Sequence, residues 1–390
     1  MMKILMFSAD PTILDNESSA AKRMVEYGRR VEKLDILVLT PHLAVRPPSG
    51  GNLANNVGAY ALTGKLTRFL KAFFKARQMI KREKYDLLVA QDIEHAFVCW
   101  LLTWTRRVQV GGGDTACPVW QMQIHTDIFS PFFTRHSVFN KIRAMLAKFL
   151  ISRASCVRVV SERIKNSILR TRNIHLDVKR PSVEVLPILA EPLRTFDVRS
   201  DGERPSVFNE FDKTILMVSR LTSEKNIGLA IEAIAEVVKK HPKTGLIIVG
   251  DGPERDALKL KAKSYKLQSN VKFEGWQKDV ASYYKGADIF LLTSWYEGWG
   301  MSVIEAMRYG AAVVMTDVGL AGELVEDKKN GLVVPVNDKN ALVVSILRLL
   351  ENDELRRDLV EEAAKKVQKL PPVETYYQKM VESWQKCVNS

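Results

Sequence analysis

Short runs of aliphatic and β-branched residues alternate with helix-length segments through the second half of the chain, and this alternation restricts the fold most. Between two such runs, Ile227–Lys240 repeats apolar residues with the period of a helix. Strands separated by helices pair in parallel, because a parallel connection needs a long crossover. The sequence therefore predicts a parallel sheet with strands at Thr214–Ser219, Thr244–Gly250, Val271–Gly275, Ala287–Ser294, Ala311–Thr316 and Gly331–Pro335.

The first half repeats this scheme less regularly, and 390 residues suit two α/β domains. Glu191–Asp212 contains Pro192, Gly202 and Pro205 with little periodicity and is expected to connect the domains. We predict domains at 1–190 and 191–372, facing each other across a cleft, and a final helix at 373–390 after two prolines. The expected first-half strands are Lys3–Phe7, Leu34–Thr40, Leu87–Ala90, Val119–Ile124 and Val157–Ser161, with helices at about 19–30, 65–83, 138–153 and 162–170.

Cysteine usage and hydropathy limit the class of protein. The longest apolar run, Ala96–Trp104, is too short to span a bilayer and predicts a buried helix. The cysteines have no CxxC spacing and no histidine cluster, which argues against a disulfide framework or a zinc site and favours a reducing cytoplasm. We therefore expect a cytoplasmic protein without a bound metal. The four cysteines are Cys99, Cys117, Cys156 and Cys387.

The positive charge is confined to the first half. Residues 1–200 hold 31 Lys and Arg against 17 Asp and Glu, whereas residues 201–390 hold 27 against 28. Two basic helical patterns, at 65–84 and 135–153, contain much of the excess. Such helices could pack on their own sheet with a solvated basic face, or attach the protein to anionic lipid at the inner face of the plasma membrane. Nucleic acid is disfavoured because no binding motif or aromatic platform accompanies the charge.

Ser294–Ala306 follows a predicted strand and leads into a helix, so it lies where parallel sheets bind ligands. Gly298 and Gly300 let the backbone approach a ligand, and the first helical turn attracts an anion such as a diphosphate. Glu305 could accept hydrogen bonds from two vicinal hydroxyls of a ribose. The alternative is an ordinary strand–loop–helix with solvated carboxylates.

Ser219–Asn226 occupies the equivalent position after another strand. It carries Arg220 and Lys225, which could stabilise the charge of a departing nucleoside diphosphate. By itself this segment could also be a solvated helix start. The turn at Gly252 follows a third strand and is a weaker signal.

These segments together resemble glycosyltransferase family 4. The resemblance covers residues 214–350 and rests on the Glu297–Glu305 spacing, Ser-Arg-Leu…Glu-Lys at 219–225, Gly-Asp-Gly-Pro at 250–253 and the Gly-Ala-x-Val-Val-x-Thr-Asp-Val-Gly run at 310–319. It implies a retaining enzyme of the type-B (GT-B) fold, with two Rossmann-like domains and a last helix that crosses back to the first. The resemblance implies donor-binding residues at Arg220, Lys225, Gly252, Trp276, Gly298, Trp299, Gly300, Met301, Ser302 and Glu305, with Glu297 near the reacting carbon.

The same resemblance assigns His125, which follows a predicted strand, to the transferred sugar. Asp127 is a candidate for the acceptor side. The Gly-Gly loop that many members carry after their first strand is absent, and Ser18 and Ser19 are the candidates in the segment that replaces it. The acceptor is therefore less defined than the donor.

The expected activity is transfer of a sugar from a UDP-, GDP- or ADP-sugar to a hydroxyl acceptor, either lipid-linked or a growing cell-surface glycan. No Asp-x-Asp pair is present, which indicates a reaction without metal or other cofactor. A nucleotide-sugar epimerase and a non-catalytic nucleotide-sugar-binding subunit are the alternatives. A dinucleotide dehydrogenase is disfavoured because no G-x-G-x-x-G follows the first strand.

Overall fold

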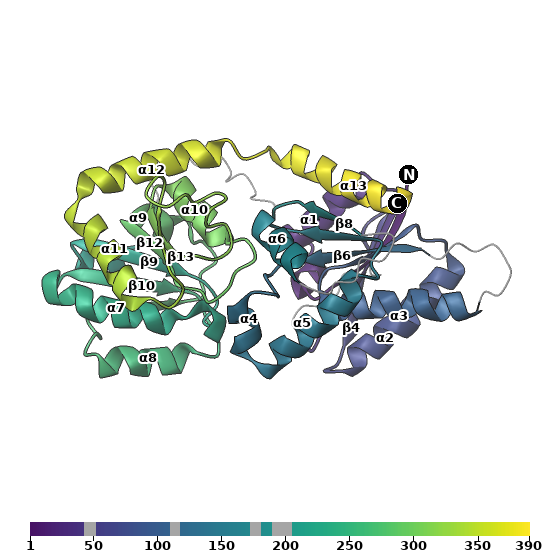
Figure 1. Cartoon of the computed structure of the whole chain (residues 1–390), viewed down its shortest axis with the longest axis horizontal. Coiled ribbons are helices and arrows are strands. Elements are labelled where there is room, and N and C mark those ends of the chain that lie inside the picture. Colours follow the sequence, from purple (N-terminus) through teal and green to yellow (C-terminus); the bar gives the residue numbers. More distant parts are fainter. Residues whose placement is uncertain (43–51, 110–117, 172–180, 189–204) are drawn as a thin grey trace. The chain divides into compact units, whose positions relative to one another are not determined.

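The computed structural model describes residues 1–42, 52–109, 118–171, 181–188 and 205–390, and it divides the chain into two units. The first contains residues 1–129, 137–187 and 373–390, and the second contains residues 130–136 and 188–372 (Figure 1). The expected boundary at 190/191, the glycines at 111–113 and most of the expected linker lie outside the described residues.

The first unit is built on an eight-stranded sheet in the order β3-β4-β2-β1-β5-β6-β7-β8. Every pair is parallel except β3 with β4. Five strands lie close to their predicted positions, whereas β3, β4 and β8 were not predicted. The strands are β1 Lys3–Ser8, β2 Lys33–Thr40, β3 Asn52–Ala54, β4 Val57–Thr63, β5 Leu87–Ala90, β6 Val119–Ile124, β7 Cys156–Val159 and β8 Ser182–Val185.

Helices cover both faces of this sheet. Helices α1 and α13 pack against each other on one face, and α2, α3 and α5 lie side by side on the other (Figure 1). The last helix, α13, therefore returns to the first unit. The helices of the first unit are α1 Ser19–Gly28, α2 Thr67–Arg82, α3 Ile93–Gln109, α5 Val138–Ile151, α6 Glu162–Arg170 and α13 Val373–Asn389.

The second unit has a six-stranded, fully parallel sheet in the order β11-β10-β9-β12-β13-β14. Its strands begin and end within two residues of the predicted ones, because most of them are short buried runs between polar turns. They are β9 Lys213–Val218, β10 Thr244–Val249, β11 Val271–Gly275, β12 Ile289–Leu292, β13 Ala312–Thr316 and β14 Leu332–Val334.

The helices of the second unit enclose an aliphatic core. Helix α7 buries Ile227, Ile231 and Ile234, which confirms the periodicity read from the sequence. The helices are α4 Pro131–His136, α7 Ile227–Lys240, α8 Arg255–Ser264, α9 Ala281–Gly286, α10 Met301–Tyr309, α11 Lys339–Glu351 and α12 Asp353–Gln368.

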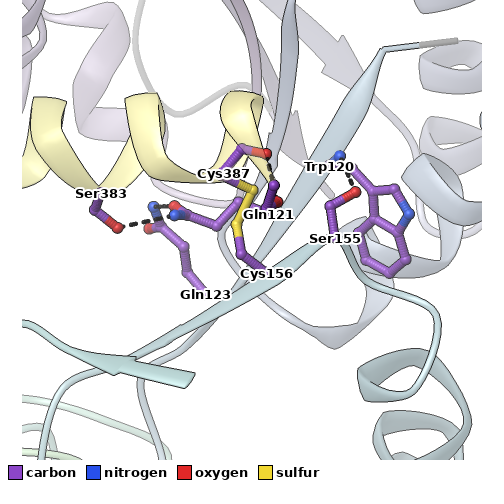
Figure 2. The surroundings of a disulfide bond; sticks show 8 residues. Trp120, Gln121, Gln123, Ser155, Cys156, Ser383 and Cys387 are labelled. Carbon is purple, nitrogen blue, oxygen red and sulfur yellow. Dashed lines mark hydrogen bonds between the residues drawn. A yellow bond between two sulfur atoms is a disulfide. The ribbon is translucent and has the colours of Figure 1, made fainter. Parts of the chain in front are cut away.

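Helix α13 is attached to the first unit by packing, hydrogen bonds and a covalent bond. Trp384 is fully buried and meets the ring of Tyr27 edge-on, with centroids 5.2 Å apart. The Gln121 amide nitrogen donates a hydrogen bond to Ser383 Oγ at 3.0 Å. Cys156 of β7 and Cys387 of α13 form a disulfide, with Cα atoms 5.6 Å apart (Figure 2).

The expectation that the cysteines form no disulfide is therefore wrong. The two residues are 231 positions apart, and only the return of α13 brings them together, so their spacing in the sequence carried no signal. The argument for a reducing compartment loses its support with it. Cys99, by contrast, is a buried thiol, and burial raises its pKa well above the usual value.

Candidate active site

The predicted donor residues lie on loops at one edge of the second sheet. The loops after β9, β10, β11 and β12 all leave the carboxyl ends of parallel strands. The strand order reverses between β9 and β12, and loops on either side of such a reversal form the ligand site of open α/β sheets. The loop after β9 carries Lys225, and the loop after β12 carries Glu297.

Lys225 and Glu297 form an ion pair across this point. Lys225 Nζ lies 2.5 Å from Glu297 Oε1, and Ser294 Oγ donates to the same oxygen at 2.8 Å. Both charged side chains are largely buried. Two segments 72 residues apart in sequence thus bring an ammonium and a carboxylate together, so that each fixes the position of the other.

Backbone contacts hold the two loops in this position. Thr293 Oγ1 donates to the carbonyl oxygens of Lys225 and Asn226, at 2.9 and 3.0 Å. The Trp295 amide donates to the Glu224 carbonyl at 2.8 Å. Asn226 has a left-handed backbone with φ of 49°, which ends the loop and starts α7. Hydrogen bonds to the backbone thus hold together the two loops that carry the pair.

Arg220 lies on the same loop as Lys225 but makes a different contact. Its side chain is 77% exposed, and Nη2 lies 3.5 Å from Glu224 Oε1. Glu224 also accepts a hydrogen bond from Thr222 Oγ1 at 2.6 Å. Arg220 thus belongs to the edge without joining the Lys225–Glu297 pair, and it remains accessible to a ligand anion.

The loop from Gly298 to Gly300 leads into the N-terminus of α10. Gly300 adopts a φ of 104°, and α10 has no side-chain cap at its N-terminus among the described residues. The Leu320 amide donates to the Trp299 carbonyl at 3.0 Å, and a Cβ on Gly319 would stand 2.6 Å from that carbonyl oxygen. The amides of Met301 and Ser302 form the first turn of α10, the part of a helix that attracts anions.

Glu305 lies one turn further along α10, apart from the Lys225–Glu297 pair. Tyr284 donates a hydrogen bond to Glu305 Oε2 at 2.7 Å. Burial raises the pKa of Glu305, while the Tyr284 hydrogen bond and the Arg308 charge act in the opposite direction. A carboxylate has several lone pairs, so Tyr284 orients it without exhausting its capacity to accept.

Gly252 and Trp276 occupy the far side of the edge. A Cβ on Gly252 would stand 2.4 Å from the Leu221 carbonyl oxygen, so only glycine lets the β10 loop approach the β9 loop this closely. The Leu221 amide donates to Asp251 O at 2.9 Å across the same contact. Trp276 is 72% exposed after β11 and offers a flat apolar surface.

Helix α4 also contributes to this cluster, and no pattern in the sequence indicated it. This short helix belongs to the second unit, although residues on both sides of it belong to the first. Phe132 lies against Trp295 and Phe133 against Tyr296, with ring centroids 5.9 and 5.1 Å apart. His136 Nε2 lies 2.9 Å from Ser223 Oγ. These aromatic contacts brace the loop that carries Glu297, and no local pattern in the sequence links them.

The remaining candidates, His125, Asp127, Ser18 and Ser19, belong to the first unit. His125 directly follows β6, and burial, with a smaller effect of the Arg158 charge, lowers its pKa to about 3, so the imidazole is neutral near pH 7. Asp127 is buried two residues further on. Ser18 caps α1 by accepting from the Ala21 amide at 3.0 Å, and Ser19 is the first residue of that helix. Ser18 thus has a structural role of its own.

Two family models match successive parts of the chain. Residues 20–188 match a glycosyl transferase 4-like domain, and residues 199–366 match glycosyl transferases group 1. The alpha-monoglucosyldiacylglycerol synthase of Streptococcus pneumoniae is 35% identical over 122 residues, which are 31% of this chain and 28% of that protein. The matches to the first curated relatives span between 26% and 48% of those proteins.

Solved structures match over nearly the whole chain. Sucrose-phosphate synthase from Thermosynechococcus elongatus superposes with a TM-score of 0.75 at 20% identity, covering 98% of each chain. Anabaena HepE, solved with UDP and glucose, superposes with a TM-score of 0.70 at 20% identity, covering 99% of this chain and 100% of that one. The order of the two family domains and the two parallel sheets agree, and the chain belongs to glycosyltransferase family 4, with the GT-B fold.

Proposed function

We propose that this chain is a retaining glycosyltransferase that moves a hexose from a nucleoside-diphosphate sugar to a hydroxyl acceptor. The observation that carries the proposal is the Lys225–Glu297 pair at the strand-order reversal, beside the uncapped start of α10. A preorganised cation and helix amides stabilise a departing diphosphate more than they stabilise the intact donor, and such contacts lower the barrier.

In the proposed reaction, the acceptor oxygen forms a bond to the anomeric carbon on the face from which the diphosphate leaves. The bond from that carbon to the phosphate oxygen breaks, and the departing phosphate oxygen takes the hydroxyl proton. Lys225 and Arg220 balance the developing charge, and Glu297 orients the transferred sugar. Glu305 binds the ribose. His125 contacts the sugar as a neutral imidazole, an assignment that stays a prediction.

The test is turnover of Lys225→Ala. Loss of one preorganised contact to a developing charge costs roughly 100- to 1,000-fold in rate. Lys261→Ala is a matched control, because Lys261 forms a similar ion pair with Glu232, also at 2.5 Å, between α8 and α7. Lys225→Ala should lose turnover while it melts like the control. Equal turnover in the two variants would refute the assignment.

Product analysis separates the two alternatives. A nucleotide-sugar epimerase would convert the donor without an acceptor, and a non-catalytic subunit would bind the donor without turnover. A transferase releases the nucleoside diphosphate in proportion to the glycosylated acceptor. The partially buried Lys225–Glu297 pair favours the transferase, since a pure binding site needs no such pairing next to the sugar.

The donor can be identified with a panel of UDP-, GDP- and ADP-sugars. The HepE structures with UDP and with UDP-glucose make a UDP-sugar the first candidate. A donor at a hundred times its dissociation constant should stabilise the folded protein by about 2.7 kcal/mol, which a thermal shift detects. We also propose that the reaction needs no metal, so turnover should persist in the presence of a chelator.

We propose a lipid-linked acceptor or a growing cell-surface glycan, met at the inner face of the plasma membrane. The name of the Streptococcus relative, alpha-monoglucosyldiacylglycerol synthase, supports a lipid acceptor. The basic excess of residues 1–200 supports a contact of the first unit with anionic lipid. Transfer to a diacylglycerol-type acceptor in detergent is the corresponding assay.

A further inference from the structure

Exposed apolar side chains are concentrated on one layer of helices. Sixteen large apolar side chains are exposed in the described part of the chain, and ten of them belong to α2, its N-cap, α3 and α5. Scattered single apolar residues are ordinary on a protein surface, but a concentration of this kind marks an interaction site. The ten are Leu66, Leu70, Phe74, Phe97, Trp104, Val138, Phe139, Ile142, Met145 and Phe149.

Helix α5 has small apolar residues on its inner face and large ones on its outer face. The face toward the protein carries the small residues Ala144 and Ala147 together with Leu150. The outer face carries Phe139, which is 78% exposed, and Met145, which is 72% exposed, with Val138, Ile142 and Phe149 along the same stripe. A helix at a water interface shows the reverse arrangement, with its bulk inward.

Helix α2 repeats this arrangement. It buries Ala72, Ala76 and Ile80, while Leu66, Leu70 and Phe74 project outward at intervals of four residues. The apolar periodicity in the sequence therefore described an outer stripe as much as a buried one. Alanines thus take up part of the inner face of both helices, while several large apolar side chains of each are exposed.

The stripes adjoin because α3 lies between α2 and α5 (Figure 1). Trp100 of α3 meets Phe149 of α5 with ring centroids 5.1 Å apart, and Arg143 of α5 pairs with Glu94 of α3 at 2.7 Å. Trp104 stacks on Trp100 at 6.0 Å and is half-exposed. We call the outer faces of α2, α3 and α5, with the ten residues named above, the apolar layer.

A hollow of about 860 Å³ opens at the end of this layer. Trp100, Trp104 and Phe149 line it, and the Arg153 guanidinium lies 3.6 Å from the Phe149 ring centroid. Tryptophan beside arginine is typical of the membrane–water interface, where an apolar ring and a charged head face different surroundings.

The charges on the apolar layer indicate which kind of partner it binds. Helix α2 carries six Lys and Arg and α5 carries three, and neither contains Asp or Glu. A second copy of the chain would bring the same cations against one another, which opposes self-association through this face. An anionic bilayer offers both an apolar interior and negative headgroups.

We propose that the apolar layer inserts into an anionic bilayer and holds the first unit at the membrane surface. The proposal adds to the proposed function the helices that contact the lipid. It rests on that function only in that a lipid-linked acceptor would explain why the first unit binds a membrane. Within the described residues no helix combines the length and apolar content needed to span a bilayer, so attachment by this layer is peripheral. Cations alone would give binding that salt abolishes, whereas insertion resists salt.

Vesicle sedimentation tests the proposal. Wild-type protein should bind vesicles of phosphatidylglycerol and phosphatidylcholine and stay largely bound in about 0.5 M salt, where charge interactions are screened. The variant Phe139→Ser/Ile142→Ser/Met145→Ser should bind at least tenfold more weakly. Leu260→Ser/Val344→Ser is the matched control, because both residues are exposed and apolar on the second unit, and it should bind like wild type. Binding to pure phosphatidylcholine should be weaker than binding to the anionic vesicles, by about as much as 0.5 M salt weakens the latter.

Bromolipid quenching gives a second measurement. Vesicles with brominated acyl chains should quench the emission of Trp104, and the quenched part should disappear in Trp104→Phe. Equal binding of the triple variant and wild type would overturn the proposal, as would no binding to either vesicle. If wild type were a dimer and the triple variant a monomer, the layer would be assigned to self-association instead. Donor turnover should be the same in all these variants, so its absence would count against the proposed function and not against the layer.

Discussion

The two units differ in the sequence separation of the residues whose contacts hold each unit together. In the second unit, the loops after β9, β10 and β12 are joined by hydrogen bonds to backbone carbonyls, from the Leu221 amide to Asp251 and from Thr293 Oγ1 to Lys225. In the first unit, a helix from the end of the chain packs on the sheet and is bonded to β7. The contacts between these loops, such as that of Thr293 with Lys225 across 68 residues, span less of the sequence than the bond of α13 to β7, which joins residues 231 positions apart.

Removing the anchor of α13 should give the largest effect. Trp384→Ala should lower the free energy of unfolding of the first unit by about 3–5 kcal/mol, because the indole is fully buried. Denaturant unfolding followed with probes in each unit measures this. Trp276→Ala, at an exposed tryptophan of the second unit, is the control. If both units lose stability equally, the comparison fails.

A change at one glycine should destabilise only the second unit. Gly250 has a φ of 134°, and a Cβ there would stand 1.8 Å from the Ser219 carbonyl oxygen. Gly250→Ala should therefore cost roughly 3 kcal/mol and weaken donor binding. Gly322→Ala shares the positive φ but meets no atom within 4 Å, so we expect about 1 kcal/mol. Donor titration and denaturant unfolding of both variants test this prediction. Equal losses of stability in the two variants would contradict the role of the close approach at Gly250.

Breaking the disulfide should destabilise the first unit to a similar or smaller extent. Cys387→Ser should cost about 2–4 kcal/mol under oxidising conditions, since the cross-link restricts the unfolded chain. A reductant should shift the melting of wild type and leave that of the variant unchanged. Cys99→Ala serves as control and should keep its sensitivity to reductant. If reductant left the melting temperature of wild type unchanged, the disulfide would not form in the protein.

The smallest effect concerns Glu305. Its folded pKa is raised by burial, so near neutral pH the folded protein carries a cost for ionising it that the unfolded chain does not. This cost disappears as the pH falls through the folded pKa. Glu305→Gln should therefore raise the melting temperature slightly at pH 7, with a gain that shrinks as the pH falls toward 4, and it should weaken donor binding. A gain that is independent of pH would contradict the burial argument.

The sequence predicted the second unit better than the first for a physical reason. Most of its strands are buried aliphatic runs, and the candidate site residues follow directly after strands, so the local pattern locates both the strands and the candidate site. The strands β3 and β8 have partly exposed residues and no clear alternation, and they were missed. Ala96–Trp104 did form a helix, but Trp104 on it is half-exposed.

It was harder to predict which face of a helix points toward the core. Periodicity at Leu66 and Leu70 predicts a stripe, but it does not say whether that stripe or the alanines opposite face the core. Contacts between distant residues, such as Phe132 with Trp295, leave no local pattern at all. Most of the strands and helices could be predicted, whereas the pairings that only the folded chain creates could not, and the assignment of the loops to a donor stays a prediction.

The bond between Cys156 and Cys387 also has a topological consequence. Residues 188–372, almost all of the second unit, lie between the two cysteines, so the disulfide closes a covalent ring that contains them. One proteolytic cut inside that ring would leave both fragments linked, and they would migrate as a single band until reduced. The second unit is in this sense an insertion between two tethered points of the first, so a single cut cannot release it.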